Sequence, residues 1–148
     1  MKNILLVFLA FVIVTSVVPE ASGQSKLVMK VKIASDANDG NPVAFDLVLV
    51  TDKALLEELK KLSASEWFEN RSQYRLDYPE ETGLSAGSWE WVPGQVVVIE
   101  PITVKRGIVG GVIFANYSTP GRHRAVIDPR KSLAVTLGPE GFTIAQEK

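Results

Sequence analysis

Apolar and polar residues alternate along most of this chain, and that pattern predicts β-strands. Between residues 26 and 35, Leu27, Met29, Val31 and Ile33 occupy every second position, as in a strand with one buried face. Similar alternation, or a short apolar run bounded by turn residues, predicts further strands at residues 43–50, 84–92, 95–104, 108–117, 122–127, 132–137 and 142–144. Short strands separated by turn residues in this way are typical of a two-sheet β-sandwich.

One segment, residues 52–78, departs from the alternation and predicts two short helices. Thr51 or Asp52 can cap the first helix and Ser63 the second, while Pro79 disfavours helical backbone at the residue before it. Apolar side chains recur at helical spacing: Leu55, Leu56, Leu59, Leu62, Trp67 and Phe68. Short helices are marginal alone, so we expect Leu55, Leu59, Trp67 and Phe68 to be buried against the sandwich.

Three features of the strands predict how they are placed. The strand at 43–50 is apolar on both faces, so we expect the opposite sheet to cover one face and the helical insert the other. Pro101 cannot donate to a neighbouring strand, which predicts an edge or a bulge at that point. Gly110 and Gly111 predict a bulge or the close approach of another backbone.

The first 23 residues have the pattern of an export signal. Lys2 precedes a 15-residue apolar run, 4–18, and the small residues 21–23 form a cleavage site before Gln24. The run is shorter than the roughly 20 residues that span a bilayer, so a cleaved signal is favoured over a permanent anchor. We therefore expect a signal peptide at 1–23 and a single domain at 24–148.

Composition limits the possible functions. The net charge is −1, so there is no basic excess to pair with phosphates, and nucleic acid is not an expected partner. With no cysteine and one histidine, a zinc site is not expected, and neither is any other metal or cofactor. An exported chain without cysteine fits a bacterial periplasm better than a eukaryotic secretory route.

Three places could carry chemistry, and each has a simpler interpretation. His123 could act as a base, but the sequence identifies no nucleophile or orienting acid beside it, so an exposed residue at the start of a strand is favoured. Trp89 and Trp91 could form a stacking platform for a sugar, although two tryptophans on one face of a small sandwich are more often core. The loop at 36–41 resembles a calcium loop, but Gly40 and Leu47 stand where ligands are needed, and a turn is favoured.

The order of elements resembles the type VI secretion lipoprotein family, whose members are periplasm-facing outer-membrane proteins of transthyretin-like sandwich fold. The stretches that carry the resemblance are 43–51 running into Leu55-Leu56, 67–76, 92–99 with its Pro93-Gly94 turn, and 108–117 running on to 122–126. Family members carry a lipid-bearing cysteine at the first mature position, where this chain has Gln24. The resemblance therefore implies a soluble periplasmic variant, or one held by its partner alone, and leaves membrane association open.

The resemblance also implies a partner-binding loop. In that family the loop between the first two strands helps to contact the inner-membrane partner, and its counterpart here is residues 36–42. Four polar side chains of the loop have no obvious internal partner in the sequence: Asp36, Asn38, Asp39 and Asn41. Loops displayed from a rigid scaffold often carry recognition residues, although an ordinary hydrophilic hairpin remains the simpler interpretation.

The leading hypothesis is a non-enzymatic periplasmic assembly component of a type VI secretion-like envelope complex, binding a protein partner in the periplasm. A small-ligand or glycan-binding sandwich that uses Trp89 and Trp91 is the alternative. A hydrolase centred on His123 is a weaker third possibility.

Overall fold

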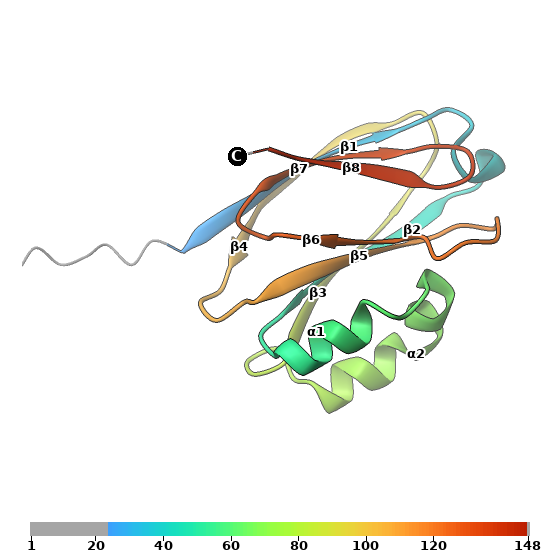
Figure 1. The fold of residues 1–148 in the computed structure, drawn as a ribbon. Coiled ribbons are helices and arrows are strands. Elements are labelled where there is room, and N and C mark those ends of the chain that lie inside the picture. The colour runs from blue at the N-terminus through green and yellow to red at the C-terminus, as the bar shows by residue number, and fades with distance from the viewer. Residues whose placement is uncertain (1–23, 148) are drawn as a thin grey trace, which may run out of the picture.

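The computed structural model describes residues 24–147, which form two four-stranded sheets with a pair of helices on one side (Figure 1). The predicted signal peptide at 1–23 lies outside the described residues. The strands are β1 (Ser25–Ile33), β2 (Val43–Val50), β3 (Leu84–Trp91), β4 (Val96–Val104), β5 (Gly110–Asn116), β6 (Arg124–Ile127), β7 (Ser132–Leu137) and β8 (Phe142–Glu147). The helical elements are the short η1 (Ala37–Gly40), α1 (Lys53–Leu59) and α2 (Ala64–Asp77).

The two sheets have the strand orders β4-β1-β7-β8 and β3-β2-β5-β6. In the first sheet β1 and β7 run parallel, and the other pairs of strands within the two sheets run antiparallel. The predicted two-sheet sandwich with a helical insert after the second strand is therefore confirmed. The last strand is longer than predicted, because its end pairs with the start of β7 through Glu147 and Ser132.

The main core fills the space between the sheets, and it is built from alternate residues of the strands. Leu27, Met29, Val31 and Ile33 all point into it, as their spacing predicts. Phe45, from the central strand β2, contacts Trp91 with ring centroids 4.9 Å apart. Burial of this apolar surface is the main force that holds the two sheets together.

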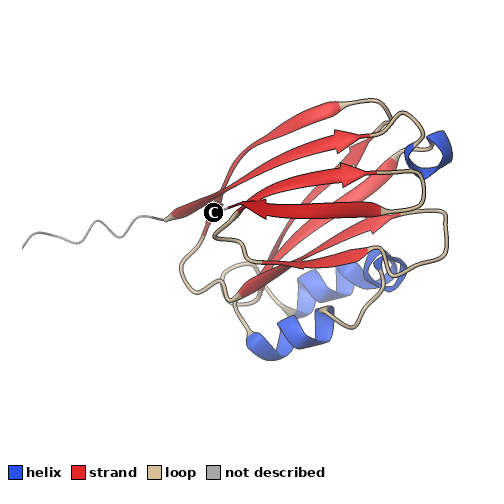
Figure 2. Cartoon of the chain, turned by 45° about the horizontal axis from the view of Figure 1, so that its top comes forward, coloured by secondary structure: helices blue, strands red, loops and turns tan. Residues whose placement is uncertain are grey.

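A second core lies between the helices and the outer face of the sheet that contains β2. Figure 2 shows both helices along this one side of the stacked sheets. Trp67 of α2 is fully buried and stacks on Phe114 of β5 at 5.1 Å. Leu55 and Leu59 are also buried, whereas Phe68 is only partly covered. The insert packs as predicted except at Phe68, which is not fully buried, and β2 is covered on both faces.

The two helices begin at capping residues that the sequence indicates. Asp52 accepts a hydrogen bond from the backbone N–H of Leu55 at 2.7 Å, which satisfies a free donor in the first turn of α1. Ser63 forms a capping box with Glu66, in which each side chain accepts from the other residue's backbone N–H. Of the two predicted caps for α1, Asp52 takes the role, because the hydroxyl of Thr51 donates to the carbonyls of Thr82 and Gly83 instead.

Two local predictions about the strands have different outcomes. Pro101 lies on the edge strand β4, where the register with β1 shifts opposite Leu27 and Met29, so the predicted edge and irregularity are both present. Gly110 and Gly111 lie in regular pairing with β2, and the predicted bulge is wrong. A Cβ at position 110 would lie 2.6 Å from Cδ2 of Leu56, so a helix side chain approaches this glycine rather than another backbone.

Candidate functional site

The loop at 36–42 carries the chain from one sheet to the other, beyond the end of β1. Three consecutive residues, Asn38, Asp39 and Gly40, have positive φ angles of 49°, 55° and 81°. Asparagine, aspartate and glycine are the residues that best tolerate this left-handed conformation, so the local sequence permits the turn. The hydrogen bonds of the Asn38 side chain hold the loop in this one backbone conformation.

Asn38 is 4% exposed and joins the loop to the segment after β5. Its Oδ1 accepts from the backbone N–H of Ser118 at 2.7 Å and from the Ser118 hydroxyl at 2.9 Å. Its Nδ2 donates to the carbonyl of Pro42 at 3.0 Å. The expectation that Asn38 lacks an internal partner is therefore wrong, because burial forces its amide to pair within the protein.

The side chains of the other three predicted residues differ in whether they have a hydrogen-bond partner within the protein. The Asn41 side chain is exposed but donates to the carbonyl of Asn38 at 3.0 Å, so it also has an internal partner. Asp36 and Asp39 are exposed, and neither side chain makes a hydrogen bond or ion pair within residues 24–147. The structure thus divides the four residues into two that hold the loop and two that it displays.

A hollow of about 490 Å³ lies beside the loop and extends its surface onto the ends of β2, β3 and β5. Residues from the loop and from these three strands line it: Asn38, Pro42, Ala44, Glu90, Asn116, Tyr117 and Ser118. Glu90 is exposed and has no ion pair in the described part of the chain. Asp36, Asp39 and Glu90 are thus exposed carboxylates at this end without an ion pair among residues 24–147, and each can attract a basic group.

His123 lies directly before β6 and packs against the same end of the molecule. Its ring stacks on Tyr117 with centroids 4.9 Å apart, and Nε2 lies 2.8 Å from the carbonyl oxygen of Thr119. A carbonyl only accepts, so Nε2 carries the hydrogen and donates it. Burial raises the pKa of Tyr117 to about 12, and its hydroxyl donates to the carbonyl of Gly141 at 2.9 Å. These contacts give His123 a packing role, and the ring is half-buried rather than exposed as expected.

Trp89 and Trp91 stack on each other at 5.8 Å within the core between the sheets. Trp91 is 6% exposed, and Trp89 is partly buried against it. The interpretation as core is confirmed, and the rings do not form an exposed platform for a sugar. They lie in the main core, on the opposite side of the sheet from Trp67.

Residues 24–147 contain neither a helix that could cross a membrane nor a cluster of metal-binding side chains. No helix within 24–147 is long and apolar enough to cross a bilayer. The same residues contain no group of three or more His, Cys, Asp or Glu side chains placed to hold a metal ion. The loop at 36–41 contains the short 3-10 turn Ala37–Gly40.

No family model matches this sequence, and no curated protein matches it. Solved structures do. TssJ1, the type VI secretion lipoprotein of Pseudomonas aeruginosa, superimposes with a TM-score of 0.65 at 13% identity, over 85% of this chain and 98% of TssJ1. The protein has the TssJ1 fold. The likeness extends over nearly the whole of TssJ1, rather than over one sheet.

Two further structures share this TssJ-like fold. A chain of a type VI membrane complex matches with a TM-score of 0.62 at 10% identity, over 83% of this chain and 99% of that one. Lip of Serratia marcescens, a membrane-bound component of the type VI secretion system, matches with a TM-score of 0.60 at 11% identity, over 85% and 99%. At these identities the likeness establishes the fold, and the fold predicted from the resemblance is confirmed.

Sequence reasoning missed the residues that build the surface around the loop at 36–42. Ser118 lies 80 positions from Asn38, and Glu90 belongs to a strand whose partner could not be read from local spacing. The available signal was that an asparagine in a turn needs a hydrogen-bond partner if it is buried. Nothing in the sequence indicates that this asparagine is the buried member of the loop.

Proposed function

We propose that this chain is a non-enzymatic assembly component of a type VI secretion-like envelope complex, and that it binds the periplasmic part of an inner-membrane component. The observation that carries the proposal is the fold, which is shared with chains described as a type VI lipoprotein and as part of a type VI membrane complex. The absence of a lipid-bearing cysteine distinguishes this chain from the lipoprotein family that it resembles. Without a lipid attached to such a cysteine, its assembly into the complex would rest on contacts with other proteins.

The loop at 36–42 is the proposed contact surface. Asn38 fixes its backbone, so that little conformational entropy is lost when a partner binds. Asp36 and Asp39 are displayed on it, and the neighbouring Glu90 borders the hollow beside it. This arrangement supports a partner whose surface presents basic side chains, one of which could enter the hollow.

Periplasmic location is the second part of the proposal. It rests on the pattern of residues 1–23, with cleavage before Gln24. Mass spectrometry of the protein from a periplasmic extract should give a chain that begins at Gln24. A chain that retains Met1 or Lys2 and fractionates with membranes would contradict cleavage.

The docking proposal can be tested by removing charge while leaving the loop conformation intact. In Asp36→Asn with Asp39→Asn, both residues still tolerate their backbone angles, and no internal hydrogen bond is lost. Co-purification of the variant with the periplasmic part of the inner-membrane component from the same cells should fall at least tenfold, as expected when about 1.4 kcal/mol of binding free energy is lost.

The matched control is Glu69→Gln with Asp77→Asn, which removes two exposed charges from α2. This control should co-purify as the wild type does. Equal capture of the loop variant and the wild type would exclude the loop as the contact. Equal loss in both variants would indicate a general charge effect and would also contradict the proposal.

A further inference from the structure

A second hollow, of about 480 Å³, lies at the end of the sandwich opposite the loop at 36–42. β1 runs from one end to the other, and its nine residues separate the two ends by about 30 Å. The hollow lies where the first residues of β1, the last residue of β4 and the turn before β7 meet. Its lining residues are Gln24, Ser25, Val104, Lys105, Arg106, Ile108 and Arg130.

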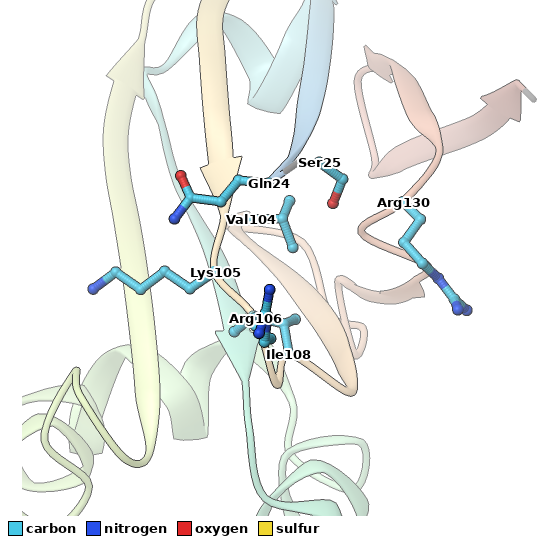
Figure 3. A pocket seen from close by; sticks show the side chains of 7 residues that line it. All are labelled: Gln24, Ser25, Val104, Lys105, Arg106, Ile108 and Arg130. Carbon is cyan, nitrogen blue, oxygen red and sulfur yellow. The ribbon is translucent and has the colours of Figure 1, made fainter. Parts of the chain in front are cut away.

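Three cationic side chains surround this hollow. Figure 3 shows Arg106 in the middle of the view, below Gln24 and Ser25, with Lys105 and Arg130 on opposite sides. Lys105 and Arg106 come from the turn after β4, while Arg130 comes from the turn between β6 and β7. The fold therefore gathers into one place cations that are separated in the sequence.

The charges at this end are only partly neutralised. Arg130 pairs with Asp128 through two bonds, from Nε to Oδ1 at 2.9 Å and from Nη2 to Oδ2 at 3.2 Å, and Lys105 pairs with Glu80 at 2.9 Å. The Lys105–Glu80 pair is exposed on both sides, and such pairs contribute little stability, so a competing anion can replace the carboxylate of Glu80. The two-bond contact of Arg130 with Asp128 is stronger, so Arg130 adds positive charge beside the hollow while it stays paired. Arg106 has no hydrogen bond or ion pair among the described residues. Glu147, opposite Ser132 at the end of β8, adds a further carboxylate near the turn that carries Arg130.

The hollow lies where the chain enters the fold. Gln24 is the first described residue and lines the hollow, and the apolar run at 4–18 ends six residues before it. Six extended residues span at most about 20 Å. If the run stays in a membrane, this end of the sandwich faces the lipid headgroups. If the run is cleaved, an anionic membrane would still attract this end of the sandwich through Lys105, Arg106 and Arg130.

We infer that this basic hollow binds the phosphate of anionic phospholipid headgroups, so that the sandwich lies on a membrane by its β1-entry end. A guanidinium presents several N–H donors in a plane and pairs with two phosphate oxygens at once, which suits Arg106, while Arg130 adds positive charge beside it. The partly apolar floor, formed by Val104 and Ile108, fits against the glycerol portion of a lipid. The loop at 36–42 then points away from the membrane and stays available to a protein partner.

The test is co-sedimentation of residues 24–148 with vesicles. This form is suitable because residues 24–147 contain both sheets, both helices and both cores. The wild type should sediment with vesicles of phosphatidylcholine containing phosphatidylglycerol, and not with phosphatidylcholine alone. Each cation near an anionic surface strengthens binding about fivefold. Arg106→Gln should therefore weaken binding about fivefold, and Arg106→Gln with Arg130→Gln about 25-fold.

The matched control is Lys30→Gln with Lys32→Gln, which removes two cations from the exposed face of β1, away from the hollow. It should bind within about twofold of the wild type, because charges beyond the screening length of about 10 Å contribute little. Wild-type binding that does not depend on phosphatidylglycerol would overturn the inference. So would an unaltered double arginine variant, or an equal loss in the lysine control.

Inorganic phosphate distinguishes a membrane ligand from a soluble one. Added phosphate at matched ionic strength should not release the protein from anionic vesicles, because many lipids act together at a surface. Release by phosphate, with saturable phosphate binding that the arginine substitutions abolish, would make the hollow a site for a soluble anion and contradict membrane binding. The inference does not depend on the docking proposal, since the two tests change residues at opposite ends of β1.

Discussion

The Asp46 carboxylate and the Trp67 indole meet inside the second core, where Oδ2 accepts from Nε1 at 2.9 Å. Both residues are fully buried, and Asp46 lies on β2 while Trp67 lies on α2. Arg71, one turn further along α2, places Nη1 3.3 Å from both carboxylate oxygens and stacks on Phe68. The contact is the buried polar link between the helical insert and the sandwich, and it fixes the position of α2 on the sheet.

Asp46→Ala should lower the free energy of unfolding by about 2–3 kcal/mol, because it leaves the Trp67 N–H unpaired in an apolar core. Arg71 is more exposed and can turn toward water, which limits the loss. In a domain of this size the melting temperature should fall by about 10 °C. Asp46→Asn keeps an acceptor for Trp67 and should cost about half as much. If Asp46→Ala melts with the wild type, the link does not stabilise the insert.

Gly110→Ala should destabilise the protein by about 1 kcal/mol, because its Cβ would lie 2.6 Å from Cδ2 of Leu56 and the leucine side chain must move aside. The same substitution in a Leu56→Ala background should cost close to nothing, since the obstructing atom is gone. Urea unfolding of the wild type, both single variants and the double variant gives the coupling energy. A coupling near zero would mean that α1 does not pack over β5 as described.

Asn38→Ala should be more destabilising than Asn38→Gly. Both remove the hydrogen bonds to Ser118 and Pro42, at about 2 kcal/mol in total. Alanine must also adopt a φ of 49°, which costs about 1 kcal/mol more, whereas glycine adopts it freely. Chemical denaturation of the two variants measures the difference. Equal stabilities would show that the backbone of the loop relaxes when its side-chain anchor is lost.

Alkaline pH should destabilise the protein partly through Tyr117. Burial raises the pKa of its phenol from 10.0 to about 12, so the folded state holds its proton more tightly than the unfolded state. The stabilising effect is complete below pH 10 and is lost as pH rises toward 12. Burial and the hydrogen bond to Glu58 raise the pKa of Tyr74 to about 12 as well.

Tyr117→Phe should therefore reduce the decline in stability over this pH range without abolishing it. The same variant should lose about 1 kcal/mol at neutral pH, because the carbonyl of Gly141 loses its donor. Thermal melts from neutral pH to pH 11 measure both effects. A decline as steep as that of the wild type would assign the alkaline sensitivity to other groups.

The sequence determined the features that depend on near neighbours in the chain. The strand at 43–50 has the predicted bounds, because its apolar run is bounded by Pro42 and Thr51. The insert and the caps at Asp52 and Ser63 follow from helical spacing and from side chains that pair with N–H groups only three residues away. Such interactions are local, so spacing alone identifies them.

Only the tertiary structure decided which distant residues share an environment. Spacing does not specify that β1 lies parallel to β7, because one alternating strand can pair with many others. Asp46 resembles an ordinary polar break in an apolar strand until Trp67 and Arg71 are packed over it. Asn38 resembles an exposed turn residue until Ser118, 80 positions later, takes its amide into the interior. Burial makes such pairings necessary, and burial is a property of the folded chain as a whole.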